Sequence, residues 1–569
     1  MQRDRDQHLS SLRDIPGREP CWVRAQIPVT GRLLIQQAKS IINNVQYAKK
    51  YGGRFVLRLD DTSKNCEAQF DEGILHDVGM LDVSVDQVSH SSDFFGYCQQ
   101  HAEKMLLNGW AYMDGTPIAQ INRDRERGLA SPFRDTPASR NIARFHALLR
   151  GDPGADAYCL RAHTREDIKL VHLSMRDPIL FIAGKEHYRM GSTYAAYPTS
   201  SFCTPIADSY EGITHALRTN DAPAVTGMTT SGRPILVENT RDGQDWTAME
   251  DYPSFELYAW LQSVLQLRGA ALYNSNGLQL SHTVGRGQVS KLLDANLLEG
   301  WDDPRLPTII GLERRGLSLS ILKSFLYSTG GRQMAQLSWK SLWAANKRYW
   351  EQHAARYMAI DDSDYVEVVI TEVPRGFVPI SVPQHPRNGE LGYRTMYASH
   401  SILIERFDAA EVREGEMVTL LRWTSVVIRE VLRNSHGAVV LIRAEYIPVF
   451  EFLKKKRAVT WLANCADLVP LRVIKYGDLL GKPYLEKGDN PVRFFNYNSC
   501  STESLLGDPE LRKVPIGQVI QLERRGFFRI DQPNTSPTEP MVLIMVPFRK
   551  GKERSRKGKG DGGRFSVPS

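Results

Sequence analysis

The chain has 569 residues, of which 42% are hydrophobic and 24% are charged. That length allows for roughly three to five domains with substantial cores, and the composition is typical of globular proteins. A fibrous, miniature or wholly disordered chain is therefore excluded. No segment approaches the roughly eighteen apolar residues that a membrane-spanning helix needs, so we expect no membrane partner.

The positive charge is concentrated at one end of the chain. The net charge is +7, and residues 548–569 carry eight Lys and Arg against Glu553 and Asp561, which leaves the rest nearly neutral. A basic segment on a neutral body binds polyanions through counterion release, which makes RNA the first partner to consider. The same composition also suits a disordered, solubilising tail, and both interpretations stay open.

Cysteine usage and the N-terminus bear on the cellular compartment. Seven cysteines occur without any Cys-x-x-Cys pair, which argues against a zinc knuckle and a disulfide framework and favours a reducing compartment. We predict no metal site. Residues 1–20, interpreted as an N-terminal extension, alternate Arg with Asp, unlike secretory signals or acid-poor transit peptides. We therefore expect a cytoplasmic protein and leave mitochondrial import open.

The first elements of the chain predict a β-α-β unit. Residues 21–27 alternate apolar and polar side chains as in a strand, and apolar residues recur at helical spacing over residues 34–48. Two glycines then precede a second strand over residues 54–59. Such a unit indicates a parallel sheet whose ligand lies at the carboxyl ends of the strands, near Gly31 in the first loop.

Later segments differ in character. Residues 118–150 are Arg-rich and helical in pattern, which predicts an inserted subdomain, and residues 221–250 are polar, which predicts a long surface loop. From about Tyr365 the hydrophobic period changes from helical to two. Short β-rich segments separated by turns then indicate antiparallel barrels. These segments are residues 366–370, 417–423, 438–447, 519–530 and 541–546.

Seven short stretches occur in a fixed order along nearly the whole chain. They are RLDDT at 58–62, MRDP at 175–178, EGITHALRT at 211–219, GWDDPRLPT at 300–308, GEMV at 415–418, LGDP at 506–509 and QLERRGFF at 521–528. Together they make the chain resemble the glutamyl-tRNA synthetases of the eukaryotic and archaeal type, which are class I enzymes related to glutaminyl-tRNA synthetases.

The resemblance implies an α/β Rossmann-type catalytic domain with an inserted acceptor-stem-binding subdomain and a helical region, followed by two all-β anticodon-binding barrels. It also implies the ATP-dependent formation of glutamyl-adenylate and transfer of the glutamyl group to tRNA. The implied boundaries are 21–117 and 197–300 for the two halves of the Rossmann domain, 118–196 for the insertion, 301–360 for the helical stem-contact region and 361–547 for the barrels, before the tail at 548–569.

The first motif of that chemistry is degenerate here. In the family a His-Ile-Gly-His turn handles the ATP phosphates and lets adenine approach the backbone. It aligns with Leu34, Ile35, Gln36 and Gln37. Both histidines are lost, Gln36 replaces the glycine, and Gln37 keeps the potential to donate one bond. Losing a single preorganised donor typically lowers the rate by roughly 10² to 10³, so we expect severe impairment.

The second motif, the Lys-Met-Ser-Lys-Ser loop, is also degenerate. It aligns with residues 284–288, where Arg286 keeps one cation between Gly285 and Gly287. Arginine has a planar guanidinium fork and lysine a compact ammonium group, so the exchange is not neutral. The flanking glycines predict a flexible loop. We therefore name no catalytic residue with certainty.

Part of the amino-acid pocket remains. The resemblance assigns Arg24 to the substrate carboxylate and Asp60 to the substrate amino group, and it retains Tyr197 and Arg218. The usual Tyr-Pro-x-Tyr-Asp-Phe segment is residues 197–202 here, and it has lost an aromatic wall and a carboxylate. Alternatively, Arg24 and Asp60 form an internal ion pair, and we weight that interpretation higher because an unpaired charge in a closed cleft is costly.

The segments that the resemblance directs to RNA are better retained. The resemblance places Arg524 and Arg525, with Phe527 and Phe528, on a barrel that meets the anticodon loop. There, cations would pair with phosphates and aromatic rings would stack on bases. Phenylalanine at strand spacing also suits a core, so the arginines are the stronger candidates. Two basic runs, which are often solvated turns, supply further candidates. These are Lys454, Lys455, Arg556 and Lys557.

Three functions follow from this pattern. The leading hypothesis is a glutamyl-tRNA synthetase-like protein that no longer activates an amino acid, needs no cofactor, and binds tRNA or another structured RNA within a ribonucleoprotein or protein assembly. The rival is an active glutamate–tRNA ligase with divergent motifs, which would need ATP and Mg²⁺. The third is a structural subunit that binds protein alone.

Deleting residues 548–569 tests the role of the tail. If the tail neutralises phosphates, the truncated chain should bind RNA more weakly, and the slope of log affinity against log salt should become shallower. Filter binding or fluorescence anisotropy over a salt series measures both quantities. A solubilising tail would leave the affinity and the slope unchanged.

Overall fold

The computed structural model describes residues 21–164, 173–220, 227–228, 234–235, 255–276, 278, 280–328, 338–373, 375–447, 457–486, 488–536 and 539–547. The chain divides into two compact units. Unit 1 contains the residues up to Trp339 together with Tyr476–Cys500, and unit 2 contains Lys340–Lys475 and the residues from Ser501 onward. The N-terminal extension, the tail and most of the polar loop at 221–250 lie outside the described residues.

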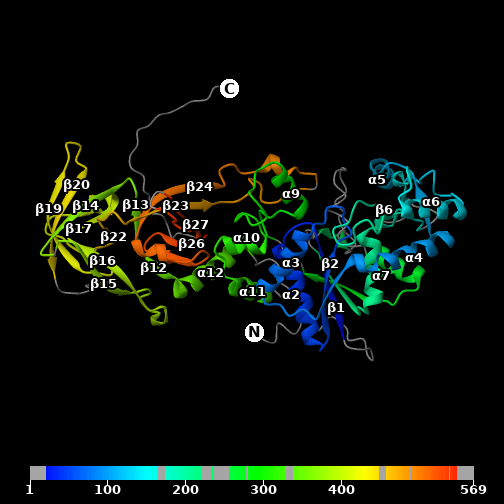
Figure 1. Ribbon diagram of the computed structural model, residues 1–569, viewed down its shortest axis with the longest axis horizontal. Helices are drawn as coiled ribbons and strands as arrows, with labels where there is room; N and C mark the ends of the chain where they lie inside the picture. Colours follow the sequence, from blue (N-terminus) through cyan, green and yellow to red (C-terminus); the bar gives the residue numbers. More distant parts are fainter. Residues whose placement is uncertain are drawn as a thin grey trace, which may run out of the picture. The chain divides into compact units, whose positions relative to one another are not determined.

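Unit 1 is organised around a five-stranded parallel sheet in the order β11-β8-β1-β2-β3 (Figure 1). This confirms the predicted β-α-β opening and the Rossmann-type architecture. The strands are β1 Trp22–Pro28, β2 Arg54–Asp60, β3 Gln87–His90, β8 His215–Asn220 and β11 Ala271–Asn276. The accompanying helices are α2 Ile35–Lys50, α3 Ala68–Met80, α7 Ser200–Glu211 and α8 Phe255–Leu265.

A second, antiparallel sheet in the order β4-β5-β6-β7 interrupts the parallel one. Its strands are β4 Ala111–Asp114, β5 Cys159–Ala162, β6 Ile179–Ala183 and β7 Ala196–Pro198, and its helices are α4 Phe95–Leu107, α5 Ile118–Arg127 and α6 Ala138–Arg150. The sheet therefore begins before residue 118, where we predicted the insertion to start, because β4 pairs with β5. Inside the polar loop, β9 Gly227–Met228 pairs with β10 Pro234–Ile235.

The MRDP stretch makes a set of buried polar contacts within this insertion. The carboxylate of Asp177 accepts from Arg134 Nε at 2.7 Å and from the hydroxyl of Tyr112 at 3.1 Å. Arg161 donates to the main-chain oxygen of Asp177 at 2.9 Å and pairs with Asp114 at 2.7 Å. The described contacts of the stretch therefore contribute to the packing of the insertion.

Helices follow the parallel sheet. They are α9 Arg286–Asp294, α10 Ile309–Arg314, α11 Leu319–Ser328 and α12 Trp339–His353. The buried Lys39 of α2 donates to the main-chain oxygen of Leu326 in α11 at 2.8 Å, which ties the two helices together. No helix among the described residues combines the length and the apolar character that crossing a bilayer requires.

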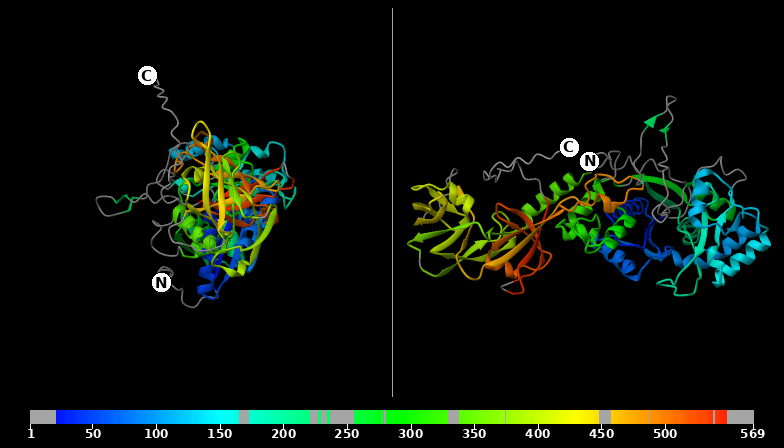
Figure 2. Two further views of the ribbon diagram at one scale, coloured as in Figure 1. Left: turned by 90° about the vertical axis from the view of Figure 1, so that its left-hand side faces the viewer. Right: turned by 90° about the horizontal axis from the view of Figure 1, so that it is seen from above.

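Unit 2 contains two seven-stranded sheets that close into nearly complete barrels, visible as the yellow and the orange-to-red strands in Figure 2. One has the order β21-β18-β19-β20-β14-β17-β22 and the other β12-β25-β26-β27-β23-β24-β13. The first is formed by β14 Tyr365–Thr371, β17 Ser401–Glu405, β18 Met417–Leu420, β19 Ser425–Arg433, β20 Val439–Ile447, β21 Arg457–Val459 and β22 Trp461–Ala463. The second is formed by β12 Ala355–Tyr357, β13 Ala359–Asp361, β23 Val469–Tyr476, β24 Cys500–Gly507, β25 Val519–Leu522, β26 Gly526–Gln532 and β27 Met541–Met545.

Two features of unit 2 differ from the sequence prediction. Residues 519–530 form two antiparallel strands, β25 and β26, because the chain turns at Arg524, whose φ is +65°. A separate hairpin of β15 Phe377–Pro383 and β16 Tyr393–Ser399 was not predicted. The short helix α13 Arg406–Glu411 follows β17.

Phe528 lies in the core of the second barrel. Its side chain is 2% exposed and packs in a cluster with Tyr357, Leu471 and Leu543, and Phe527 is 3% exposed. Because neighbouring side chains cover the ring, Phe528 belongs to the core and not to an RNA-contacting surface.

Replacing Phe528 with alanine should lower the free energy of unfolding of unit 2 by about 3–5 kcal/mol, because it removes a buried ring. The matched control is Phe377→Ala in the same unit, where the ring is 52% exposed and the change should be small. Urea unfolding of the two variants measures the difference. Equal stabilities together with weaker RNA binding by Phe528→Ala would contradict the core assignment.

Candidate active site

The loop between β1 and α2 passes directly under a tryptophan. Gly31 has a φ of +157°, and a Cβ atom at this position would lie 2.3 Å from the ring of Trp301. Trp301, from the GWDDPRLPT stretch, also makes an edge contact with Phe70 at 5.6 Å between ring centroids. Only glycine fits here, because any side chain would collide with the indole.

Three amide groups around the start of α2 have acceptors within the protein. Leu33 N donates to Asp77 Oδ2 at 3.1 Å, Leu34 N to the side-chain oxygen of Gln37 at 3.1 Å, and Ile35 N to the main-chain oxygen of Pro307 at 2.9 Å. Free amides at a helix N-terminus attract phosphates and other anions. Here the Asp77 carboxylate and two neutral oxygens take these donors.

The two glutamines of the first motif behave differently from the family's glycine and histidine. The side-chain oxygen of Gln37 accepts from Leu34 N, and donation of a bond by its amide nitrogen stays a prediction. The side-chain oxygen of Gln36 is buried without a hydrogen-bond partner among the described residues.

The second motif forms the start of a helix. Arg286 is the first residue of α9, with Gly285 at the N-cap, so the flexible loop that we predicted around Gly285 and Gly287 is wrong. The Arg286 side chain is 8% exposed and donates to the main-chain oxygens of Pro28 and Arg32, the latter at 3.3 Å. The retained cation is therefore directed toward the backbone at the end of β1.

A buried ion cluster joins α7 to the sheet. Asp208 accepts both hydrogen bonds of the Arg24 fork at 3.0 Å, pairs with Arg58 at 2.7 Å and accepts from the hydroxyl of Tyr258 at 2.8 Å. Arg58 also pairs with Glu211. Burial alone would raise the pKa of Asp208, but Arg24 and Arg58 outweigh it, so the pKa lies below its ordinary value. The internal ion pair proposed for Arg24 exists, but its partner is Asp208 and not Asp60.

Asp60, at the carboxyl end of β2, is bonded to neutral groups. Its Oδ2 accepts from Gln26 Nε2 at 2.7 Å and from the Ser200 hydroxyl. Its Oδ1 accepts from the main-chain N of Thr62 at 3.3 Å and from the Thr62 hydroxyl at 2.9 Å. The carboxylate is 4% exposed.

The two remaining pocket residues are placed by the sheets. Tyr197 lies in β7, is 1% exposed and stacks on Phe95 with ring centroids 5.6 Å apart. Arg218 lies in β8 opposite Asn274 of β11, but its side chain is outside the described residues. Tyr197 is therefore a core ring beside the site.

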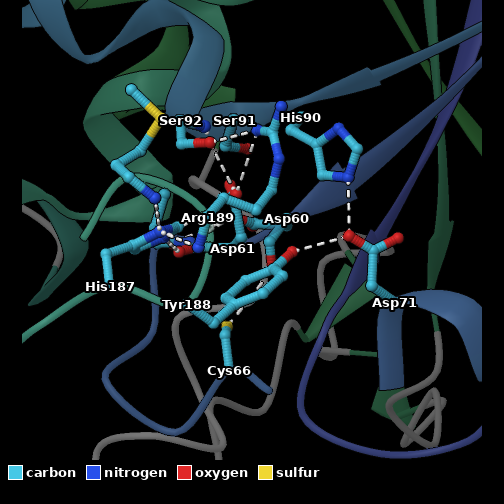
Figure 3. A network of polar contacts seen from close by, with 12 residues as sticks. Asp60, Asp61, Cys66, Asp71, His90, Ser91, Ser92, His187, Tyr188 and Arg189 are labelled. Carbon is cyan, nitrogen blue, oxygen red and sulfur yellow. Dashed lines mark hydrogen bonds and ion pairs between the residues drawn. The ribbon is translucent and has the colours of Figure 1, made fainter. Parts of the chain in front are cut away.

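A second polar network lies beside Asp60 (Figure 3). Asp61 accepts from the main-chain N of Ser92 at 2.8 Å and from its hydroxyl at 2.6 Å, and Arg189 pairs with it at 3.5 Å. His187 Nε2 is 2.9 Å from the Asp61 carbonyl, while its Nδ1 accepts from the amides of Arg189 and Met190. These contacts anchor residues 187–190 to the end of β2, and burial raises the pKa of Asp61.

The same network continues outward to Asp71. His90 Nε2 lies 2.8 Å from Asp71 Oδ2, which also accepts from the hydroxyl of Tyr188 at 2.8 Å (Figure 3). Sequence reasoning missed both halves of this network, because their members are far apart in the chain. Among the described residues, no group of three or more His, Cys, Asp or Glu is placed to hold a metal ion.

The arginines assigned to RNA are paired within unit 2. Arg524 Nη2 donates to Asp408 Oδ1 at 2.8 Å, and its side chain is 41% exposed. Arg525 is 10% exposed and pairs with Glu405 and, at 2.7 Å, with Glu503. The remaining RNA candidates lie outside the described residues. These are Lys454, Lys455, Arg556 and Lys557.

A parallel sheet interrupted by an antiparallel insertion and followed by two β-barrels is the fold of a class I tRNA synthetase. The catalytic domain of class I tRNA synthetases (E and Q) matches residues 23–225. The anti-codon binding domains of the same class match residues 354–447 and 458–531.

Relatives specify the branch of this class. The chain is 32% identical to the bifunctional glutamate/proline–tRNA ligase of Cricetulus griseus, over 98% of this chain and 36% of that one. It is 30% identical to the probable cytoplasmic glutamate–tRNA ligase of Schizosaccharomyces pombe, over 93% of this chain and 70% of that one. For the cytoplasmic glutamate–tRNA ligase of Arabidopsis thaliana the values are 30%, 91% and 68%. The chain belongs to the glutamyl-tRNA synthetase family, and it spans about a third of the length of the bifunctional relative.

Replacing Asp208 with alanine should lower the free energy of unfolding of unit 1 by about 3–5 kcal/mol, because it leaves buried guanidinium groups without their carboxylate. Since the pKa of Asp208 is lowered, the stabilisation is present at neutral pH and is lost as acid protonates the carboxylate. Urea unfolding at several pH values measures both effects. Asp152→Ala, which removes a surface pair with Arg150, should change little; equal effects of the two substitutions would refute the role of the cluster.

Proposed function

We propose that this member of the glutamyl-tRNA synthetase family does not form glutamyl-adenylate and acts as a cytoplasmic subunit that binds tRNA or another structured RNA in a larger assembly. The observation that carries the proposal is the position of Arg286. The one cation left in the second motif is buried and donates to the main-chain oxygens of Pro28 and Arg32. In that position it does not stabilise a developing phosphate charge.

The turn that the family uses for ATP supports the same conclusion. Leu34 has no side-chain donor, Gln37 accepts from the backbone, and the side chain of Gln36 fills the position where the family has a glycine. Losing one preorganised donor typically lowers the rate by roughly 10² to 10³, and here both histidines and the lysine are replaced. The described residues at this turn therefore do not fit the triphosphate of ATP and its Mg²⁺.

The RNA-binding part of the proposal is supported by unit 2 and by the tail. Both anti-codon binding domains of the class match in unit 2, and such domains imply binding of tRNA. The basic residues at 548–569 add cations suited to phosphates. Two relatives are named bifunctional glutamate/proline–tRNA ligases, and the two ligase names in one chain support a role within a larger assembly.

The alternative is an active glutamate–tRNA ligase. Relatives over most of this chain bear the name of glutamate–tRNA ligase, and Arg286 keeps a positive charge in the second motif. In that function, ATP and Mg²⁺ are required, and Arg286 turns from the backbone toward the phosphates during the reaction.

Glutamate-dependent exchange between ATP and pyrophosphate decides between the two functions. The purified chain, with Mg²⁺ and with or without tRNA, should show no exchange above a reaction lacking glutamate, whereas a cytoplasmic relative assayed in parallel should be active. Robust exchange that Arg286→Ala abolishes would refute our proposal and establish the ligase. Binding of tRNA, measured separately by anisotropy at low salt, should persist; its absence would refute the RNA-binding role.

A further inference from the structure

The contact between α7 and the parallel sheet is polar on both sides. Gln26 of β1 lies opposite Arg58 of β2 in the parallel register, two residues before Asp60. On α7, Ser200, Thr204 and Asp208 recur every four residues and therefore lie on one face of the helix. The Gln26 side chain, 1% exposed, lies where these two polar surfaces meet.

The carboxamide of Gln26 links both surfaces. Its Nε2 donates to Asp60 Oδ2 at 2.7 Å and is 3.1 Å from the Ser200 hydroxyl and 3.0 Å from that of Thr204. Its Oε1 accepts from Arg58 Nη1 at 3.4 Å and from the Thr204 hydroxyl at 3.1 Å. A neutral side chain thus occupies the space between a buried carboxylate and a buried guanidinium group.

Asp60 has no acceptor position left over. An ionised carboxylate offers about four lone-pair sites, and Asp60 receives four hydrogen bonds, two on each oxygen, from Gln26, Ser200 and Thr62. An additional ammonium donor would have to displace one of these groups. Gln26 is the donor that comes from a side chain on the neighbouring strand, so it is the one whose removal opens space beside Oδ2.

We propose that Gln26 is a built-in occupant of this site and that its carboxamide holds, against Asp60 Oδ2, the position that the ammonium group of an amino acid or another small primary amine would take. The inference rests on the proposed function, in which this pocket no longer serves adenylate formation, and on the family resemblance that assigns Asp60 to the substrate amino group. Asp208 plays the complementary part, since its carboxylate fills the Arg24 fork as a substrate carboxylate would.

Removing the carboxamide should turn this position into a site for a small primary ammonium ion. In Gln26→Ala, Asp60 loses a donor at 2.7 Å, and Ser200 and Thr204 lose an N–H group, so a buried carboxylate with unsatisfied acceptors remains. Methylammonium carries N–H donors and a positive charge and is small enough to replace a side-chain amide. Because Asp208 still fills the Arg24 fork in this variant, methylammonium is a sharper probe than glutamate.

The experiment measures binding of radiolabelled methylammonium to the full chain by equilibrium dialysis, together with the shift that it causes in the thermal unfolding midpoint. Gln26→Ala should bind at least tenfold more tightly than the native chain and should be stabilised by the ion. Tetramethylammonium, which has the same charge and no N–H group, should do neither. The matched control is Gln69→Ala, the same substitution at an exposed glutamine, which should behave as the native chain.

Two outcomes would overturn the inference. One is equal methylammonium binding by the native chain and by Gln26→Ala, and the other is no binding by a folded Gln26→Ala. If that variant does not fold, Gln26→Ser, which keeps a small polar group, takes its place under the same criteria. Neither of these two outcomes would change the result of the pyrophosphate-exchange assay. Active exchange by the native chain would refute the proposed function, but it would not show which group is bonded to Asp60 when no substrate is bound.

Discussion

The arrangement of unit 1 depends on one buried carboxylate between two guanidinium groups. Arg24 and Arg58 project from neighbouring parallel strands into a surface that is almost fully covered, and isolated charges there would be very costly. Asp208 removes that cost only when α7 lies across β1 and β2 in one register. Glycine at residue 212, with a φ of +74°, then ends the helix and leads into β8 beside β1. The ion cluster thus specifies which helix covers the sheet and where the next strand enters.

The sequence revealed the strands here but not their polar neighbour. Alternation over residues 21–27 was sufficient to predict β1, because strand periodicity is a local property. Arg24 and Gln26 on the polar face would ordinarily indicate solvent, and so would the polar stripe of α7. Each stripe covers the other, and such a match between segments more than 170 residues apart leaves no local signal. The same reason explains why the ion pair was assigned to Asp60, the nearer acid, in place of Asp208.

In the region that handles ATP in the family, several polar groups form hydrogen bonds within the protein. Gln37 accepts from Leu34 N, Pro307 accepts from Ile35 N, and Arg286 donates to Pro28. These groups bond to the backbone around the turn, whereas the buried side-chain oxygen of Gln36 has no hydrogen-bond partner among the described residues. Catalytic sites usually keep polar groups poorly satisfied, because function costs stability. Under the proposed function, the contacts at this turn serve the stability of the fold and not the binding of ATP.

The two arginines of the QLERRGFF stretch, which are equivalent candidates from the sequence alone, differ in their exposure and in the number of carboxylates that they pair with. Arg525 is nearly buried between Glu405, at the end of β17, and Glu503, in β24, so it joins the two barrels of unit 2. Moving it to a phosphate would leave two carboxylates without their cation, which is expensive at low exposure. Arg524 is 41% exposed and makes two hydrogen bonds to a single carboxylate, that of Asp408, which is itself only 3% exposed. A phosphate that approaches this turn would draw Arg524 away from one carboxylate but Arg525 away from two, so we expect Arg524 to be the more available of the two cations for RNA.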